Sequence, residues 1–266
     1  MRSVARRPVP SHPKLSHTTA DLRDPGVRRA LAGCDVIAHL GFQLWHSRDA
    51  AGVNLGGTAN VIAAAPGRIV LASSAAVYGA WPDNPLPLSE DDEARPNREC
   101  AYAEHKLEAE RRCASAVPTV SLRICAVLGP HADPLVKKAS KGWKRAVPAA
   151  RGRRQAVQFL HEDDAAAALL AAVKSEVASV YNVAPADWLD ETGVAEASGG
   201  RVVRLPFGVL LHGSEVARRL RLLDMGADRA VLLNGPLALD PARAAGDLGW
   251  KARRGSAQVL GEFLAG

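Results

Sequence analysis

The segment RIVLASS at residues 68–74 constrains the fold more than any other part of the chain. It is a short apolar run with β-branched residues, and it ends in two hydroxyl side chains, Ser73 and Ser74. Such a run indicates a strand buried on both faces of a parallel sheet. Apolar runs alternate with helical stretches along the rest of the chain. The pattern predicts an α/β fold with a Rossmann-like, doubly wound parallel sheet.

A tyrosine and a lysine stand four residues apart in the stretch YAEHK at residues 102–106. Residues four apart are neighbours on a helix surface, so the Lys106 ammonium can lie beside the Tyr102 hydroxyl. A nearby cation lowers the pKa of a tyrosine, which is about 10 when unperturbed. The pair therefore suggests an acid or base that works near neutral pH, although the same spacing also occurs in ordinary surface pairs. His105 is expected to point off their face, towards solvent.

The end of the predicted strand is a second candidate position. In open parallel sheets, ligands bind beyond the carboxyl ends of the strands. Ser73 and Ser74 stand at such an end, where a hydroxyl could bond both a substrate oxygen and the Tyr102 phenol. The alternative is that these small residues only turn the chain.

Taken together, the motifs resemble the extended short-chain dehydrogenase/reductase superfamily, the NAD-dependent epimerase/dehydratase family. The resemblance covers nearly the whole chain, and the matching stretches occur in the family's order. They include DLRD at 21–24, DVIAHLG at 35–41, NLGGTANV at 54–61, SSAAVYG at 73–79, YAEHK at 102–106 and LGW at 248–250.

This resemblance implies a role for each matching residue. Tyr102 would be the general acid/base and Ser74 would orient the substrate oxygen. Lys106 would lower the pKa of Tyr102 and bond the nicotinamide ribose, and Asn54 would support the site. The implied cofactor contacts are Asp21 and Leu22 at the adenine, together with Gly41, Ser73, Tyr102 and Lys106.

The largest departure from the family lies at the start of the chain. Family members begin with a strand, a Gly-x-x-Gly-x-x-Gly loop and a helix whose N-terminus receives the cofactor pyrophosphate. No such loop occurs here, and residues 3–8 already resemble the end of the second strand. The expected sheet is therefore N-terminally truncated by a unit of roughly 30 residues. A start assigned too far downstream, a true truncation and a loss of cofactor binding are competing explanations.

Two arginines bear on the choice of cofactor. At the end of the second strand, an acid bonds the ribose of NAD, whereas an arginine accommodates the 2′-phosphate of NADP. Arg6 and Arg7 stand there, and no acid precedes Asp21. This favours NADP over NAD, unless both arginines are simply solvated.

The formal net charge is +6, and many of the basic residues cluster in one stretch before residue 155. A basic stretch there suits an anionic substrate, such as the diphosphate of a nucleotide-sugar, or it is a solvated loop. Nucleic acid is disfavoured as a partner, because Trp143 alone offers a stacking surface. The stretch consists of Lys137, Lys138, Lys141, Lys144, Arg145, Arg151, Arg153 and Arg154.

Chain length and residue types suggest the organisation and the compartment. Residues 1–130 are expected to form an incomplete dinucleotide-binding core and residues 131–266 a small substrate-binding domain, with residues 155–184 returning to the core. The four cysteines and eight histidines show no metal-site spacing, so we expect no metal and reduced thiols. With neither a secretory signal nor a membrane span in the sequence, a cytoplasmic protein is expected, with a homodimer as a further option.

The sequence thus predicts an NAD(P)-dependent enzyme that transfers hydride between a secondary alcohol or ketone and nicotinamide. Reduction, epimerisation and dehydration share this first step, so the residues do not separate them. The alternative is a non-catalytic scaffold that serves as a ligand sensor or interaction protein, and the missing glycine-rich loop is its main support.

Overall fold

The computed structural model describes residues 1–44, 49–222 and 226–265. Its strands are β1 (Arg2–Ala5), β2 (Ser16–Thr19), β3 (Val36–His39), β4 (Arg68–Ser74), β5 (Thr119–Ile124), β6 (Ala126–Leu128), β7 (Ala146–Ala150), β8 (Phe159–His161), β9 (Val180–Val183) and β10 (Arg201–Leu205). The α-helices are α1 (Val27–Leu31), α2 (Gly57–Ala63), α3 (Ala101–Ala116), α4 (Pro134–Lys141), α5 (Glu162–Lys174), α6 (Glu191–Ser198), α7 (Phe207–Arg219), α8 (Ala227–Ala230), α9 (Ala242–Asp247) and α10 (Ser256–Ala265). The short helices are η1 (Gly52–Gly56), η2 (Ala75–Tyr78), η3 (Gly142–Lys144) and η4 (Val231–Leu233).

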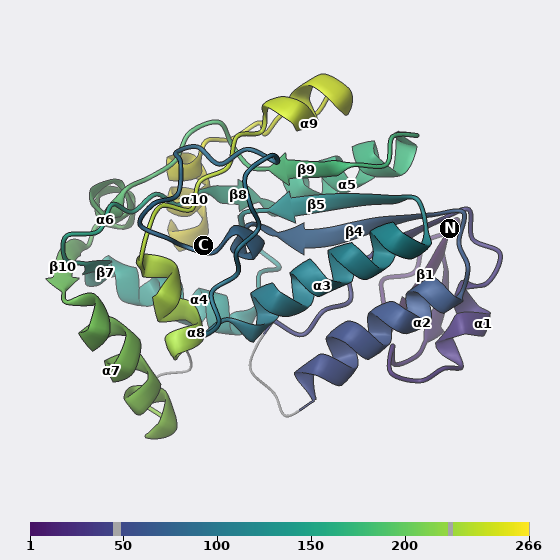
Figure 1. Ribbon diagram of the computed structural model, residues 1–266, viewed down its shortest axis with the longest axis horizontal. Coiled ribbons are helices and arrows are strands. Elements are labelled where there is room, and N and C mark those ends of the chain that lie inside the picture. The colour runs from purple at the N-terminus through teal and green to yellow at the C-terminus, as the bar shows by residue number, and fades with distance from the viewer. Residues whose placement is uncertain (45–48, 223–225, 266) are drawn as a thin grey trace.

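A parallel sheet with the strand order β3-β4-β5-β9 forms the centre of the molecule. Figure 1 shows α2 and α3 in front of this sheet and α5 behind it, with the arrowheads of β4 and β5 pointing towards the small C-terminal elements. The predicted Rossmann-like α/β fold is thus confirmed.

Strand β4 is apolar along its length because it is buried on both faces. Successive side chains of a strand point to opposite faces of the sheet. Ile69 and Leu71 pack in one cluster with residues of α1, α2 and α3, whereas Val70 packs in another with alanines of α5. A helix layer on each face therefore explains the unbroken apolar run.

Strands β1 and β2 form a separate parallel pair. Within the described residues, β1 pairs only with β2 and β3 pairs only with β4. In the part of the chain that the structure describes, one edge of β3 is therefore unpaired. Leu40, directly after β3, is 55% exposed.

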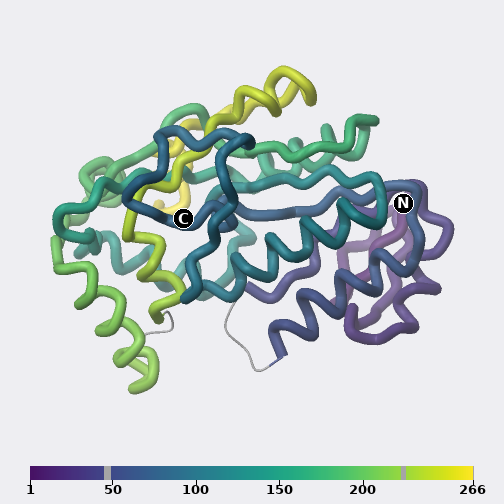
Figure 2. The backbone as a smooth tube through the Cα atoms, viewed as in Figure 1, coloured from purple at the N-terminus to yellow at the C-terminus, as the bar shows by residue number. Residues whose placement is uncertain are grey.

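Two small parallel sheets, β6-β8 and β7-β10, lie beyond the carboxyl ends of the central strands. Together with α4, α6 and α10 they surround a cluster that includes Phe159 and Leu260. In Figure 2, β1 and α1 lie at one end of the molecule and α7 lies at the other, and the chain then returns to a C-terminus near the middle. Within the described residues, no helix combines the length and the apolar character that crossing a membrane requires.

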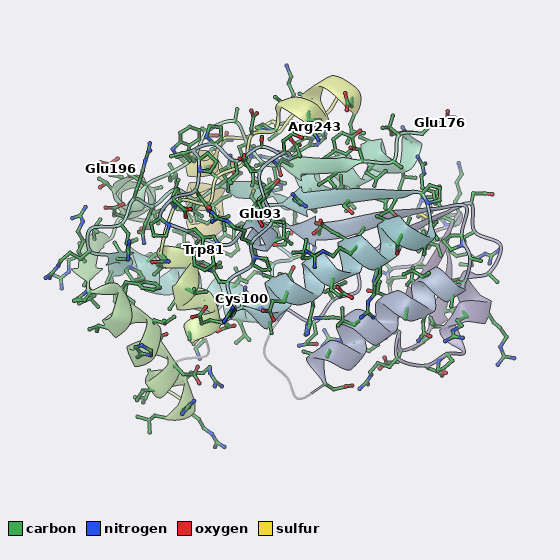
Figure 3. All side chains as sticks on the ribbon, viewed as in Figure 1. Trp81, Glu93, Cys100, Glu176, Glu196 and Arg243 are labelled. Atoms are coloured by element: carbon green, nitrogen blue, oxygen red, sulfur yellow. The ribbon has the colours of Figure 1, made fainter. Side chains whose placement is uncertain are left out.

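Helices α7 and η4 both pack against the start of α3. Phe207, Leu211, Val231 and Leu232 belong to one apolar cluster with residues of α3 and with Cys100. In Figure 3, Cys100 is labelled at the beginning of α3, beside α8. The C-terminal part of the chain thus reaches the carboxyl-end side of the sheet. The predicted division into residues 1–130 and 131–266 stays a prediction.

Candidate active site

The end of β4 and the first turn of α3 meet at one point. The Ser74 hydroxyl accepts a hydrogen bond from the Ala76 N–H at 3.2 Å, which caps η2. A further hydrogen bond joins this hydroxyl to the Tyr102 phenol. The structure therefore brings together the two side chains that the sequence placed at a strand end and on a helix.

Tyr102 is less acidic here than the helix spacing predicts. Burial raises the pKa of its phenol to about 12, while the Arg229 guanidinium and the hydrogen bond from Ser74 lower it. The Lys106 ammonium lies 5.6 Å from the centroid of the Tyr102 ring. The expectation of a lowered pKa is thus wrong for this structure, because the sequence pattern does not include the cost of burying a phenolate.

Lys106 is buried beneath an aromatic ring. Its ammonium donates to the carbonyl of Ala72 and lies 3.6 Å from the centroid of the Phe42 ring. Burial lowers the pKa of Lys106 to about 7, against the opposing charge of Glu110. Near neutral pH this lysine therefore exchanges readily between its charged and neutral forms.

Glu110 continues the helix face that carries Tyr102 and Lys106, since it lies four residues beyond the lysine. Its carboxylate accepts a hydrogen bond from the Ser73 hydroxyl and forms an ion pair of 2.9 Å with Arg123 of β5. Ser73 is 5% exposed. The structure therefore directs the Ser73 hydroxyl to a buried ion pair, and the cofactor contact that the resemblance implied for Ser73 stays a prediction.

Asn54 lies inside the π-helical turn η1, a distortion that often marks functional positions. Its Oδ1 accepts from the Gln43 N–H at 2.6 Å, and its Nδ2 lies 3.2 Å from both the Gln43 carbonyl and the His105 Nδ1. His105 is half-buried, and burial lowers its pKa. The expectation that His105 is exposed is therefore wrong. Asn54 connects the loop after β3 to α3, which agrees with a supporting role.

A small pocket of about 50 Å³ opens beside these residues. Gln43 and Leu44 follow β3, and Asp228 comes from α8. The full lining is Gln43, Leu44, Ala50, Asn54, Glu99, Cys100, Ala101, Tyr102, His105 and Asp228.

The residues predicted to contact the adenine lie on the β3 side of the site. A Cβ at Gly41 would overlap the Leu22 side chain, and one at Gly57 would lie 3.0 Å from the Leu22 Cβ. Asp21 forms an ion pair of 2.7 Å with Arg23, whose hydrogen bonds lower the pKa of Asp21 to about 2. The structure thus brings Leu22, Gly41 and Gly57 together, with an ionised carboxylate next to them.

Arg6 and Arg7 are exposed after β1. The positive charge of Arg6 helps to lower the pKa of Asp21, so Arg6 lies within electrostatic reach of the predicted adenine turn. The eight residues of the basic stretch lie in or next to α4, η3 and β7. No residue of this stretch belongs to the described lining of the small pocket, and its role in binding an anion stays a prediction.

Two residues at the site were not identified in the sequence. Phe42 covers Lys106, and its ring meets the Tyr102 ring edge-on at 6.4 Å between centroids. Arg229 donates to the Leu44 carbonyl at 2.8 Å and lies 5.7 Å from the centroid of the Tyr102 ring. Neither belongs to a motif of the family, so only the folded chain shows them.

The nicotinamide side of the site fits the cofactor that this fold implies. An ammonium has three donor hydrogens. The one hydrogen bond described for Lys106 goes to the Ala72 carbonyl, and its other described contacts are the Phe42 and Tyr102 rings. Its remaining donors suit the hydroxyls of a ribose.

The fold and the site together define an α/β protein of the Rossmann type, with a serine, a tyrosine and a lysine at the carboxyl end of its sheet. Residues 1–184 match the model of the NAD dependent epimerase/dehydratase family. The chain belongs to that family, which confirms the resemblance noted in its motifs.

This chain is also similar to individual proteins, in sequence or in fold. The uncharacterized protein y4nG of Sinorhizobium fredii is 28% identical over 271 residues, an alignment that covers 94% of this chain and 67% of that protein. The structure of MoeE5 in complex with UDP-glucose and NAD superposes with a TM-score of 0.73 at 21% identity. The UDP-glucose 4-epimerase of Thermotoga maritima with UDP-glucose gives 0.73 at 16% identity. Each superposition covers 99% of this chain and 89% of the other, and at such identities it shows the shared fold alone.

Proposed function

We propose that this chain is an NAD(P)-dependent enzyme of the epimerase type, acting on a secondary alcohol or ketone of a nucleotide-sugar. The single observation that carries the proposal is the meeting of Ser74, Tyr102 and Lys106 at the carboxyl end of β4. Ligands of open parallel sheets bind at that end. The UDP-glucose and NAD in the complex of the similarly folded MoeE5 support this choice of substrate and cofactor class.

In the proposed reaction, the residues of the chain handle the proton. Bound nicotinamide would supply a hydride acceptor for the substrate carbon. The Tyr102 oxygen would take the hydroxyl proton of the alcohol, and would return it when the ketone is reduced. Ser74 would hold the substrate oxygen through its hydroxyl, and Lys106 would bond the ribose.

The cofactor contacts are part of the same proposal. Leu22 and Gly41 would lie along the adenine side, and Asp21 would bond there once its contact with Arg23 opens. Arg6 would favour a 2′-phosphate, which makes NADP the first choice and NAD the second. In this structure, the positive charge of Arg6 contributes to the lowered pKa of Asp21.

Product analysis tests this function. The purified chain would be incubated with UDP-glucose or UDP-glucuronic acid and with NAD⁺ or NADP⁺, and the sugars followed by proton NMR. We expect a new sugar signal, or reduced nicotinamide, in at least one combination. A folded chain that binds nicotinamide yet converts none of these probes would refute a nucleotide-sugar substrate of this type.

A non-catalytic sensor is the second candidate, and the Tyr102 phenol favours it, because burial raises its pKa to about 12 and keeps it protonated at neutral pH. A sensor would bind nicotinamide or a nucleotide-sugar without converting either. The same incubations separate the two functions when the binding of each ligand is measured in parallel.

A further inference from the structure

The Arg229 side chain reaches the active site from α8, far along the chain from α3. Its guanidinium carbon lies 5.7 Å from the centroid of the Tyr102 ring. One of its nitrogens donates to the Leu44 carbonyl at 2.8 Å, and another lies 3.6 Å from the Asp228 carboxylate. The side chain of Arg229 is 18% exposed, so little water screens its charge from the tyrosine.

Lys106 provides a different kind of charge at the same ring. Its ammonium is equally near the ring, at 5.6 Å from the centroid, but burial lowers the pKa of Lys106 to about 7. A guanidinium stays protonated throughout the accessible pH range. Arg229 therefore supplies a permanent positive charge beside Tyr102, whereas the charge of Lys106 depends on pH.

We propose that Arg229 is a positioning residue of the active site, which fixes the Tyr102 ring and stabilises the negative charge that its oxygen carries during proton transfer. Any effect on turnover rests on the proposed function. The effect on the ionisation of Tyr102 does not, because it follows from the distance between the two side chains.

The charged and titratable groups around the phenol come from two elements. Cys100 and Lys106 belong to α3 and the residue before it, and Asp228 and Arg229 belong to α8. Burial raises the pKa of Tyr102 to about 12, Arg229 lowers it and Cys100 raises it. The guanidinium of Arg229 opposes the effect of burial on Tyr102. Without it, the pKa of Tyr102 should rise further.

The chain is well suited to a direct test, because it has only three tyrosines. Labelling the ring carbon that bears the hydroxyl with ¹³C gives three NMR signals, which Tyr102→Phe assigns. Tyr78 and Tyr181 also have raised pKa values, caused first by burial. Their signals serve as internal controls, since unfolding at high pH would return all three tyrosines to a pKa of about 10.

We expect Arg229→Met to lower the acid dissociation constant of Tyr102 about tenfold, the scale of one nearby charge. Arg229→Lys should lower it by a similar factor, because a lysine has a pKa of about 10.4 and is already neutral at the pH where the phenol titrates. Arg219→Met, which removes a 74% exposed arginine of α7, should leave all three signals unchanged. An Arg229→Met variant with the wild-type titration of Tyr102 would overturn the proposal. The NMR measurement needs no substrate or cofactor, so it tests the role of Arg229 independently of the proposed function.

Discussion

Replacing Tyr102 by phenylalanine is expected to lower the turnover number by a factor of about 10² to 10⁴, the usual contribution of a general acid/base. The phenol is the proposed proton carrier, and its hydroxyl is bonded to Ser74. The change removes one oxygen from a half-buried side chain. We therefore expect the folded structure to persist, as circular dichroism and the melting temperature would show.

Tyr181→Phe is the matched control for this substitution. The Tyr181 hydroxyl lies 3.3 Å from the Asp247 carboxylate, outside the described lining of the active-site pocket. This variant should keep the wild-type turnover in the product assay. A Tyr102→Phe enzyme that keeps more than about a tenth of the wild-type rate would contradict a role for Tyr102 in proton transfer.

Breaking the ion pair between Glu110 and Arg123 should have the largest effect on stability. Both side chains are less than a tenth exposed, at 7% and 8%. Losing one partner of a buried pair leaves an uncompensated charge, which costs about 3–5 kcal/mol. We expect Arg123→Met to lose free energy of unfolding on this scale in urea denaturation, and its activity to fall because Glu110 lies one helical turn from Lys106.

The pair of Glu108 and Arg112 offers a control on the same helix. These side chains are 39% and 44% exposed, so Arg112→Met should cost less than about 1 kcal/mol. The double variant Glu110→Met, Arg123→Met should recover much of the loss, since neither charge remains buried. A single Arg123→Met variant within about 1 kcal/mol of the wild type would show that the pair contributes little.

The sequence predicted the fold and the meeting of the candidate catalytic residues because both follow from local patterns. An unbroken apolar run indicates a strand buried on both faces, and the four-residue spacing puts Tyr102 and Lys106 on one helix face. Ser74 followed from the rule that parallel sheets bind ligands at their carboxyl ends. Each of these inferences needs only neighbouring residues and the family resemblance.

Strand and helix geometry also explain the observed positions of two side chains, Ser73 and His105. Ser73 has the same strand parity as Ile69 and Leu71, which pack on the α3 side, so its direction towards Glu110 follows from alternation. His105 is three residues after Tyr102, and residues three apart are also neighbours on a helix. Both positions could have been inferred from the sequence.

The remaining features depend on contacts between distant segments. Arg229 meets the Tyr102 ring only because α8 returns to the start of α3. Burial, and not the number of nearby cations, is the main cause of the pKa of Tyr102 and that of Lys106. No local pattern reports the degree of burial, so the sequence could not predict either value.

The central claim is that this chain holds a nicotinamide dinucleotide next to Tyr102 and Lys106. Isothermal titration of the folded wild-type chain with NADPH and NADH tests it most directly, with Lys106→Met as the comparison. We expect saturable binding at one site per chain, tighter for NADPH, and weaker for Lys106→Met because the ribose loses its donor. A folded wild-type chain that binds neither dinucleotide would contradict the account.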